Sequence, residues 1–207
     1  MSIFDQVQGA SSTSTSGSYT TAGTYLCRFT RFLSDKERRT KDQRTNLFME
    51  IVHEIAPPLV TESIQSLIDN APSEAARSRL LSKCEGMGVG EPRRWGQTIR
   101  EDFAKQDTSL VMQAFCAVLN ITDKEFNANP AKYQEILTGD EGGKGAGLYF
   151  IIQGTPTKTN KGTIWIKNSF RPGVATAVEL AEEGVISASA EDILGTCAAL
   201  DIEPVGC

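Results

Sequence analysis

Two stretches of the chain, residues 25–55 and 148–171, alternate apolar residues with arginine or lysine, and each folds back through a basic turn. In residues 25–32 one set of alternate positions is Tyr25, Cys27, Phe29 and Arg31. Residues 46–55 alternate in the same way, with Leu47, Met49 and Ile51 on one side. A period of two residues predicts β-strands. The connection between them, residues 34–45, is polar and basic and too long for a tight two-residue hairpin.

A second hairpin is predicted from residues 148–154 and 163–170. The connection contains Asn160, Lys161 and Gly162, which is a sequence typical of turns. In the second arm Ile164 and Ile166 share one face, whereas Trp165 and Lys167 share the other. This pattern indicates a strand with one buried side and one side that is free to bind.

Helices are predicted between the two hairpins, at residues 61–69, 73–84, 109–119 and 130–137. The segment 109–119 has the widest apolar face, and Asp107 or Thr108 can cap its start. We interpret Arg93, Arg94 and Trp95 as a loop anchor, with nucleic-acid binding as the alternative. Residues 190–200 also have a helical pattern.

This order of elements predicts an α+β protein with three parts. Residues 1–22 are rich in Ser and Thr and should form a flexible arm, because such a composition buries little surface. Residues 23–172 should form one domain in which a helical insertion, about 60–137, separates the strand pairs. Residues 173–207 should form an acidic C-terminal segment.

Charge is distributed unevenly along the chain. The net charge is -5, which argues against a generally basic coat for nucleic acid. Residues 28–44 nevertheless carry seven cations and three acids, and residues 173–207 carry seven acids and neither Lys nor Arg. This asymmetry predicts a polyanionic partner for the strands. The acidic segment could then compete with phosphate for the same cations.

Cysteine usage and hydropathy indicate a cytoplasmic protein. The five cysteines are odd in number and widely spaced, so the pattern favours neither a zinc site nor a disulfide scaffold. No leader and no apolar run long enough to cross a bilayer is recognisable. We expect no metal, no cofactor and no membrane partner.

Catalytic motifs are weak. His53 is the single histidine and lies on a predicted strand, where a structural role is more common than a catalytic one. Residues 142–145 lack the Ser or Thr that follows the lysine in a phosphate-binding loop. Glu182 and Glu183 are adjacent, so they would point in different directions on a helix. We therefore expect no enzyme activity.

Several short runs resemble a known family. These are residues 23–26, the basic turn, residues 46–51, residues 147–150 and residues 157–163. Over residues 20–172 the chain resembles the OB-fold single-stranded DNA-binding proteins of tailed bacteriophages. The resemblance implies a partly open OB-fold-like β-barrel with helices inserted between its strands, followed by an acidic C-terminal segment that is here partly helical. It also implies sequence-independent coating of single-stranded DNA in phage replication or recombination, in the host cell cytoplasm.

Such a function requires cations for the phosphates and aromatic rings on which bases can stack. The candidate nucleic-acid-binding residues are Tyr25, Arg28, Arg31, Phe32, Arg38, Arg39, Lys41, Arg44, Phe48, Tyr149, Lys158, Lys161, Trp165, Lys167 and Arg171. Replication or recombination proteins are further candidate partners, through the acidic segment, and a homo-oligomer is also considered.

Two other functions stay open from the sequence. One is a phage structural or assembly protein whose N-terminal arm contacts a neighbouring subunit. The other is a small enzyme whose site has no recognisable motif.

Overall fold

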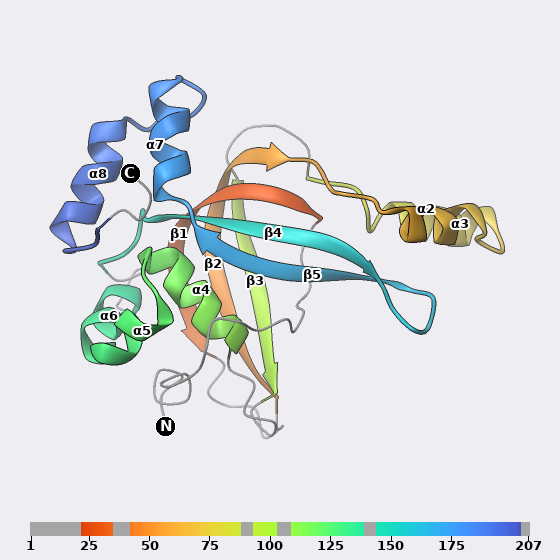
Figure 1. Ribbon diagram of the computed structural model, residues 1–207, viewed down its shortest axis with the longest axis horizontal. Coiled ribbons are helices and arrows are strands. Elements are labelled where there is room, and N and C mark those ends of the chain that lie inside the picture. Colours follow the sequence, from red (N-terminus) through yellow and green to blue (C-terminus); the bar gives the residue numbers. More distant parts are fainter. Residues whose placement is uncertain (1–21, 35–41, 88–92, 103–108, 139–143, 204–207) are drawn as a thin grey trace.

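The computed structural model describes residues 22–34, 42–87, 93–102, 109–138 and 144–203. The chain is an α+β protein built on an open antiparallel sheet (Figure 1). Strands β2 (Asp42–Ala56), β1 (Gly23–Ser34), β4 (Tyr149–Lys158) and β5 (Ile164–Pro172) are neighbours in a five-stranded sheet. Strand β3 (Arg93–Asp102) pairs along β2, which gives the order β3-β2-β1-β4-β5.

The two edge strands of this sheet are β3 and β5. In the part of the chain that the structure describes, no backbone pairing joins them, so the sheet is open and the closed wall of a barrel is not formed. Helix α4 (Ser109–Leu119) contacts both edge strands. The Gln113 Oε1 atom accepts a hydrogen bond of 3.0 Å from the Phe170 backbone N–H on β5. The helix therefore occupies the gap between the two edges.

The main core lies between α4 and the sheet. Every residue from Leu110 to Leu119 is buried except Gln113, which is half-buried. A series of aromatic contacts connects β1 to the helices: Phe29 to Phe32 with ring centroids 5.1 Å apart, Phe32 to Phe115 at 4.7 Å, and Phe115 to Phe126 at 5.8 Å. Such contacts stabilise a core beyond the area they bury. The helix with the widest apolar face in the sequence therefore lies at the centre of the core.

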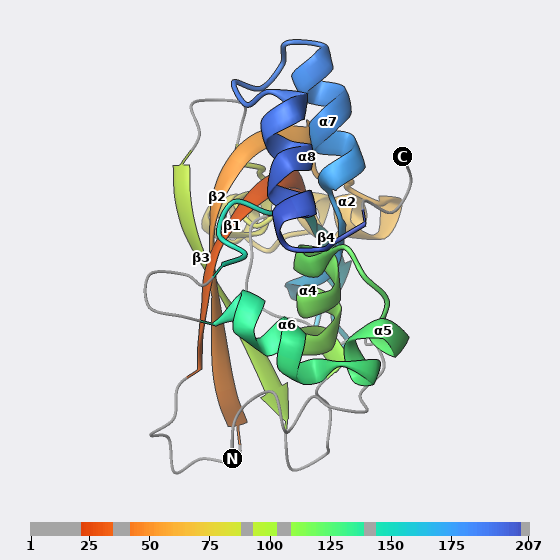
Figure 2. The same cartoon turned by 90° about the vertical axis from the view of Figure 1, so that its left-hand side faces the viewer.

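Two helical pairs flank the sheet, at different ends of the molecule (Figure 1). Helices α2 (Glu62–Asp69) and α3 (Glu74–Leu81) lie beside the end of the β4–β5 hairpin. Helices α7 (Val174–Glu182) and α8 (Ala190–Ala199) pack together beyond the start of β4. Figure 2 shows α5 (Asp123–Ala128) and α6 (Pro130–Leu137) next to α4, below this C-terminal pair.

Most predicted helices are confirmed, and three elements were missed. Strand β3 lies inside the region predicted as a helical insertion, so this region is not helical throughout, and the interpretation of Arg93 to Trp95 as a loop is wrong. Its glycine and charged residues obscure an alternating pattern. Helix α5 has only six residues, too few to show a helical period. Helix α7 has glycine at its N-cap and no capping side chain, so nothing in its sequence marks the start.

The acidic C-terminal segment is part of the folded domain. Its apolar residues Val174, Ala177, Ile186, Ile193 and Cys197 belong to the same core cluster as β1 and α4. The Asn120 Nδ2 atom donates a hydrogen bond of 2.8 Å to the Glu203 carbonyl. All seven carboxylates of the segment are on exposed residues. Removing the segment would therefore open the core as well as remove charge. Of the predicted N-terminal arm, residues 1–22, only Ala22 is among the described residues, and it is buried.

Gly173 fixes the position of α7 on the sheet. A Cβ atom at this position would lie 2.6 Å from the Phe150 Cα and C atoms. We expect Gly173→Ala to lower the free energy of unfolding by about 1 to 3 kcal/mol, because one of the two backbones must shift. Urea denaturation measures this.

Gly195→Ala is the matched control, since its Cβ would meet nothing within 4 Å and it lies inside helix α8. This variant should gain up to about 1 kcal/mol from helix propensity. Equal stability of the two variants would contradict the close approach of α7 to β4.

Candidate nucleic-acid interface

The strand register separates the sheet into two faces. The inner face packs on α4 and includes Cys27, Phe29, Leu47, Met49, Phe150 and Phe170, all buried. The alternate positions form the outer face, which we define by Arg28, Arg31, Phe48, Glu50, Tyr149, Trp165, Lys167 and Arg171. The register pairs Arg28 with both Glu50 and Tyr149, and Arg31 with Phe48. Four cations of the candidate set therefore share one side of the sheet.

Arg28 is the centre of a polar cluster on the outer face. Its guanidinium forms a salt bridge with Glu50 on the neighbouring strand. On its other side lies Tyr149, whose pKa is raised by burial. The three side chains line a cavity of about 370 Å³ together with Asp192 and Ile193 of α8. The acidic C-terminal pair thus borders the candidate interface at this point.

Arg31 and Phe48 form a second cluster, closer to the end of β1. The Arg31 guanidinium lies over the Phe48 ring, with its Cζ atom 4.8 Å from the ring centroid. Arg31 is exposed and Phe48 is half-buried. A guanidinium stacked on a ring offers a base both a flat surface and a positive charge. This pair is well suited to stacking.

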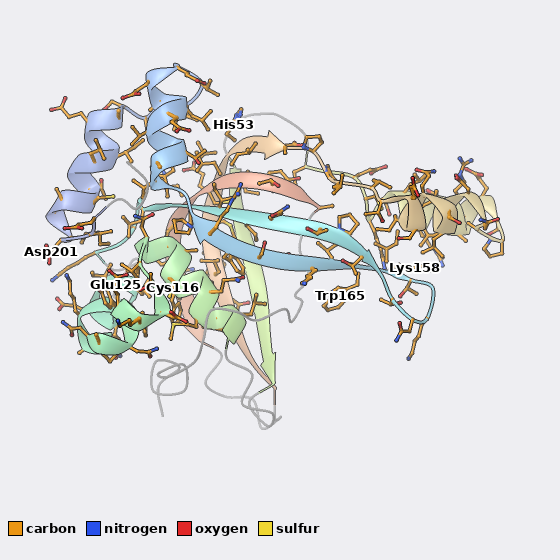
Figure 3. All side chains as sticks on the ribbon, in the orientation of Figure 1. His53, Cys116, Glu125, Lys158, Trp165 and Asp201 are labelled. Atoms are coloured by element: carbon orange, nitrogen blue, oxygen red, sulfur yellow. The ribbon has the colours of Figure 1, made fainter. Side chains whose placement is uncertain are left out.

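The β4–β5 hairpin carries the third cluster. The register pairs Trp165 with Thr157 and Lys167 with Thr155, on the same side as Arg171 opposite Ile151. Trp165 and Lys167 are half-buried, and Arg171, Lys158 and Lys161 are exposed. Figure 3 shows Trp165 and Lys158 on this hairpin, toward the opposite end of the molecule from Glu125 and Asp201. The burial pattern agrees with the predicted buried side in part, since Ile164 is buried whereas Ile166 is half-buried like Trp165 and Lys167. Binding by the other side stays a prediction.

The clusters extend along the sheet. The register joins Gly23 to Gly154, so Arg31 and Trp165 lie about eleven strand positions apart. At the usual rise this is roughly 35 Å along the strands. This length is that of several nucleotides of an extended strand, since one OB-fold occupies about 4 to 16 nucleotides. The exposed surface along it is interrupted, because Leu26 and Ile151, which the register places on the same face between the clusters, are 0% and 2% exposed.

Three of the aromatic candidates are buried, which corrects their prediction as stacking surfaces. Tyr25, Phe32 and Tyr149 are only 2%, 7% and 5% exposed. Tyr25 donates to the Ala22 carbonyl at 2.6 Å, and Phe32 packs edge-on against Phe115. A buried ring has no face on which a base can stack, so these residues leave the set of stacking platforms. Phe48 and Trp165 stay in it.

The side chains of four cationic candidates lie outside what the structure describes. Arg38, Arg39 and Lys41 lie outside the described residues, and only the backbone of Arg44 is described, on β2. The backbone register pairs Arg44 with Arg100 and Glu50 with Arg94.

Two carboxylates of the interface were missed from the sequence. Glu50 was seen only as part of the strand alternation, and Asp192 only as part of an acidic segment. Their proximity to Arg28 depends on strand register and on the docking of α8. The position of Glu50 opposite a cationic strand was the available signal, because opposite charges often pair across strands.

Other reactive groups lie apart from these clusters. Figure 3 places His53 on β2, whereas Cys116 and Glu125 are on α4 and α5. Burial raises the pKa of the Cys116 thiol to about 12 and also raises the pKa of Cys27 and Cys84. Within the described ranges, no three His, Cys, Asp or Glu side chains gather as a metal site. In the same part of the chain, no helix combines the length and apolarity needed to span a bilayer.

Comparison with known proteins gives no match. The chain matches no family model, no curated protein and no solved structure at a significant level. The functional argument therefore rests on the geometry of this chain.

The Tyr25 hydroxyl is expected to stabilise the fold without contacting a ligand. It donates to the Ala22 carbonyl and accepts a hydrogen bond of 2.8 Å from the Met87 N–H. Tyr25→Phe should lower the free energy of unfolding by about 1 to 3 kcal/mol, since two backbone groups lose a partner. Thermal or urea unfolding checks the loss. Reduced oligonucleotide affinity in a variant that is still folded would show that the hydroxyl also has a role in binding.

Proposed function

We propose that this protein binds single-stranded DNA, largely without sequence preference, and coats strands exposed during phage replication or recombination. No catalytic step is part of this proposal. The observation that carries it is the strand register, which gathers Arg28, Arg31, Lys167 and Arg171 on the face opposite α4, together with the half-buried rings of Phe48 and Trp165.

The order of strand pairing supports the finer assignment to an OB-fold. In an OB-fold the first strand pairs with the second and the fourth, the second with the third, and the fourth with the fifth. The pairs β1–β2, β1–β4, β2–β3 and β4–β5 follow the same order. Barrel closure in that fold occurs between the third and fifth strands, which are the two edges of this sheet. We propose that the chain is an OB-fold variant opened at this point by α4.

The positions of the connecting loops agree with the proposal. OB-folds bind oligonucleotides on the face of the second and third strands and with the loops between strands one and two and between strands four and five. The first of these loops corresponds to residues 35–41, whose sequence contains four cations. The second carries Lys158 and Lys161 at the hairpin end.

The chemistry of the outer face suits a strand with unpaired bases. Each base can stack on an aromatic or guanidinium surface, which contributes about 1 to 3 kcal/mol per base. Each phosphate that meets a cation releases counterions, so affinity falls as salt rises. Duplex DNA hides the base faces and would use the cations alone. We therefore propose a preference for single strands.

The acidic segment adds a competing interaction beside Arg28. Asp192 lines the same cavity, and Glu50 already pairs with Arg28. Carboxylates at this position lower the local attraction for phosphate. They support the earlier hypothesis that the C-terminal segment competes with DNA, with Asp192 as the residue nearest to the interface. Docking of replication or recombination proteins on the exposed acidic surface is a further part of the proposal.

Loss of the hairpin contacts should weaken binding. Trp165→Ala removes one stacking surface and should lower affinity for a labelled oligothymidine by about 1 to 3 kcal/mol. The double variant Lys158→Ala with Lys161→Ala should reduce the slope of log affinity against log salt by about 1.4, because each phosphate contact on a single strand contributes about 0.7. Fluorescence anisotropy at several salt concentrations measures both effects.

Lys124→Ala serves as the control, since Lys124 is an exposed cation on α5, outside the outer face. It should change neither affinity nor slope. Unaltered binding by both hairpin variants, or an equal effect of the control, would refute the proposed interface. A wild-type protein that ignores single-stranded DNA would refute the function itself.

A further inference from the structure

A second cavity lies between the helical pair α2–α3 and the end of the β4–β5 hairpin. Its volume is about 490 Å³, which is within the usual range of about 300 to 1,000 Å³ for small-molecule sites. The walls consist of Leu67, Ala71, Pro72, Ala76 and Leu80 with the polar groups Asn70, Arg79, Ser82 and Lys83, and Gly162 and Thr163 of the hairpin complete it.

The position of this cavity next to the hairpin is fixed by packing. Ile64, Ile68 and Cys84 form a separate core cluster with Ile164 of β5. The Lys83 Nζ atom donates a hydrogen bond of 3.2 Å to the Ile164 carbonyl. Ile164 and Trp165 are consecutive on β5 and point to opposite faces of the sheet. The cavity therefore meets the third cluster at the hairpin turn, where Gly162 of its lining follows Lys161.

The turn of the hairpin closes the cavity on one side. Gly162 has a φ of +68°, a conformation that favours glycine, and a Cβ at this position would lie 3.9 Å from the Leu67 Cδ1 atom. The turn therefore reaches α2 without a side chain in between. Lys161, immediately before it, is exposed at the rim.

Charge distinguishes this cavity from the one beside Arg28. Its lining includes two cations, Arg79 and Lys83, and no carboxylate. The cavity beside Arg28 includes Glu50 and Asp192, which repel phosphate. An apolar hollow with cations at its edge matches a nucleotide, whose base is flat and largely apolar on its faces and whose phosphate is anionic.

We propose that the cavity between α2–α3 and the hairpin binds one nucleotide of the single strand, at the point where the strand passes the hairpin turn beside Lys161. The base lies against Ala76 and Leu80, and the phosphate meets Arg79 and Lys83. Lys83 keeps donors for this contact, because an ammonium group has three and one is used on Ile164. This inference rests on the proposed function and extends its interface onto the helical insertion.

Two substitutions test the two halves of the cavity. Arg79→Gln removes the cation and should weaken binding of a labelled oligothymidine about fivefold at moderate salt, with a salt slope smaller by about 0.7. Ala76→Leu fills the apolar part without changing charge. It should weaken binding about tenfold, the usual value of one base contact, and leave the salt slope as it is.

Arg77→Gln is the matched control, because Arg77 is exposed on the same helix and does not line the cavity. Circular dichroism melting of each variant establishes that the fold is kept. A photoreactive 4-thiothymidine oligonucleotide gives a second readout, and its crosslinks should map to residues 70–83 in the wild-type protein and be lost in Ala76→Leu.

The outcomes separate the inference from the function it rests on. If wild-type protein and Arg77→Gln bind alike while Arg79→Gln and Ala76→Leu are weaker, the cavity is a nucleotide site. If all three variants match a tightly binding wild type, the inference is overturned and the interface ends at the hairpin. An equal loss in Arg77→Gln also overturns it, because the effect is then one of general charge. A wild-type protein that fails to bind removes the function and this site together.

Discussion

The packing of the sheet on α4 decides the character of the whole molecule. This helix is buried along its length and receives Phe29, Phe32, Met49 and Phe150 from the inner face of the sheet within one core cluster. Successive side chains of a strand point to opposite faces of the sheet. An apolar residue that packs on α4 is therefore flanked in sequence by residues that point to the outer face. The cations of β1 and β5 are therefore collected on one surface as a consequence of core formation.

The cavities beside the two helical pairs differ in the charge of their linings. The C-terminal pair brings Asp192 to the cavity beside Arg28, where Glu50 is also present. The pair α2–α3 brings Arg79 and Lys83 to the cavity beside the hairpin, without a carboxylate in the lining. A bound polyanion would consequently be held more strongly toward the hairpin, and the attraction would fall toward α8.

The sequence predicted the elements whose periodicity is strong and local. Residues 109–119 have a wide apolar face and are helix α4, and residues 164–170 form part of strand β5, as their alternation predicted. It could not predict which rings are buried. Tyr25, Phe32 and Phe48 all belong to strands whose two faces mix apolar and polar residues, and only the contacts of Tyr25 with Ala22 and of Phe32 with Phe115 place these two rings inside. Strand β3 was missed because its stability comes from pairing with β2, a tertiary contact.

The hydrogen bond from Phe170 to Gln113 has a consequence for assembly. An exposed strand edge is a template on which a neighbouring molecule can add its own strand. On β5 one such backbone donor is already occupied by a side chain of α4, and the helix lies against the strand. Growth of a continuous intermolecular sheet is disfavoured at this edge.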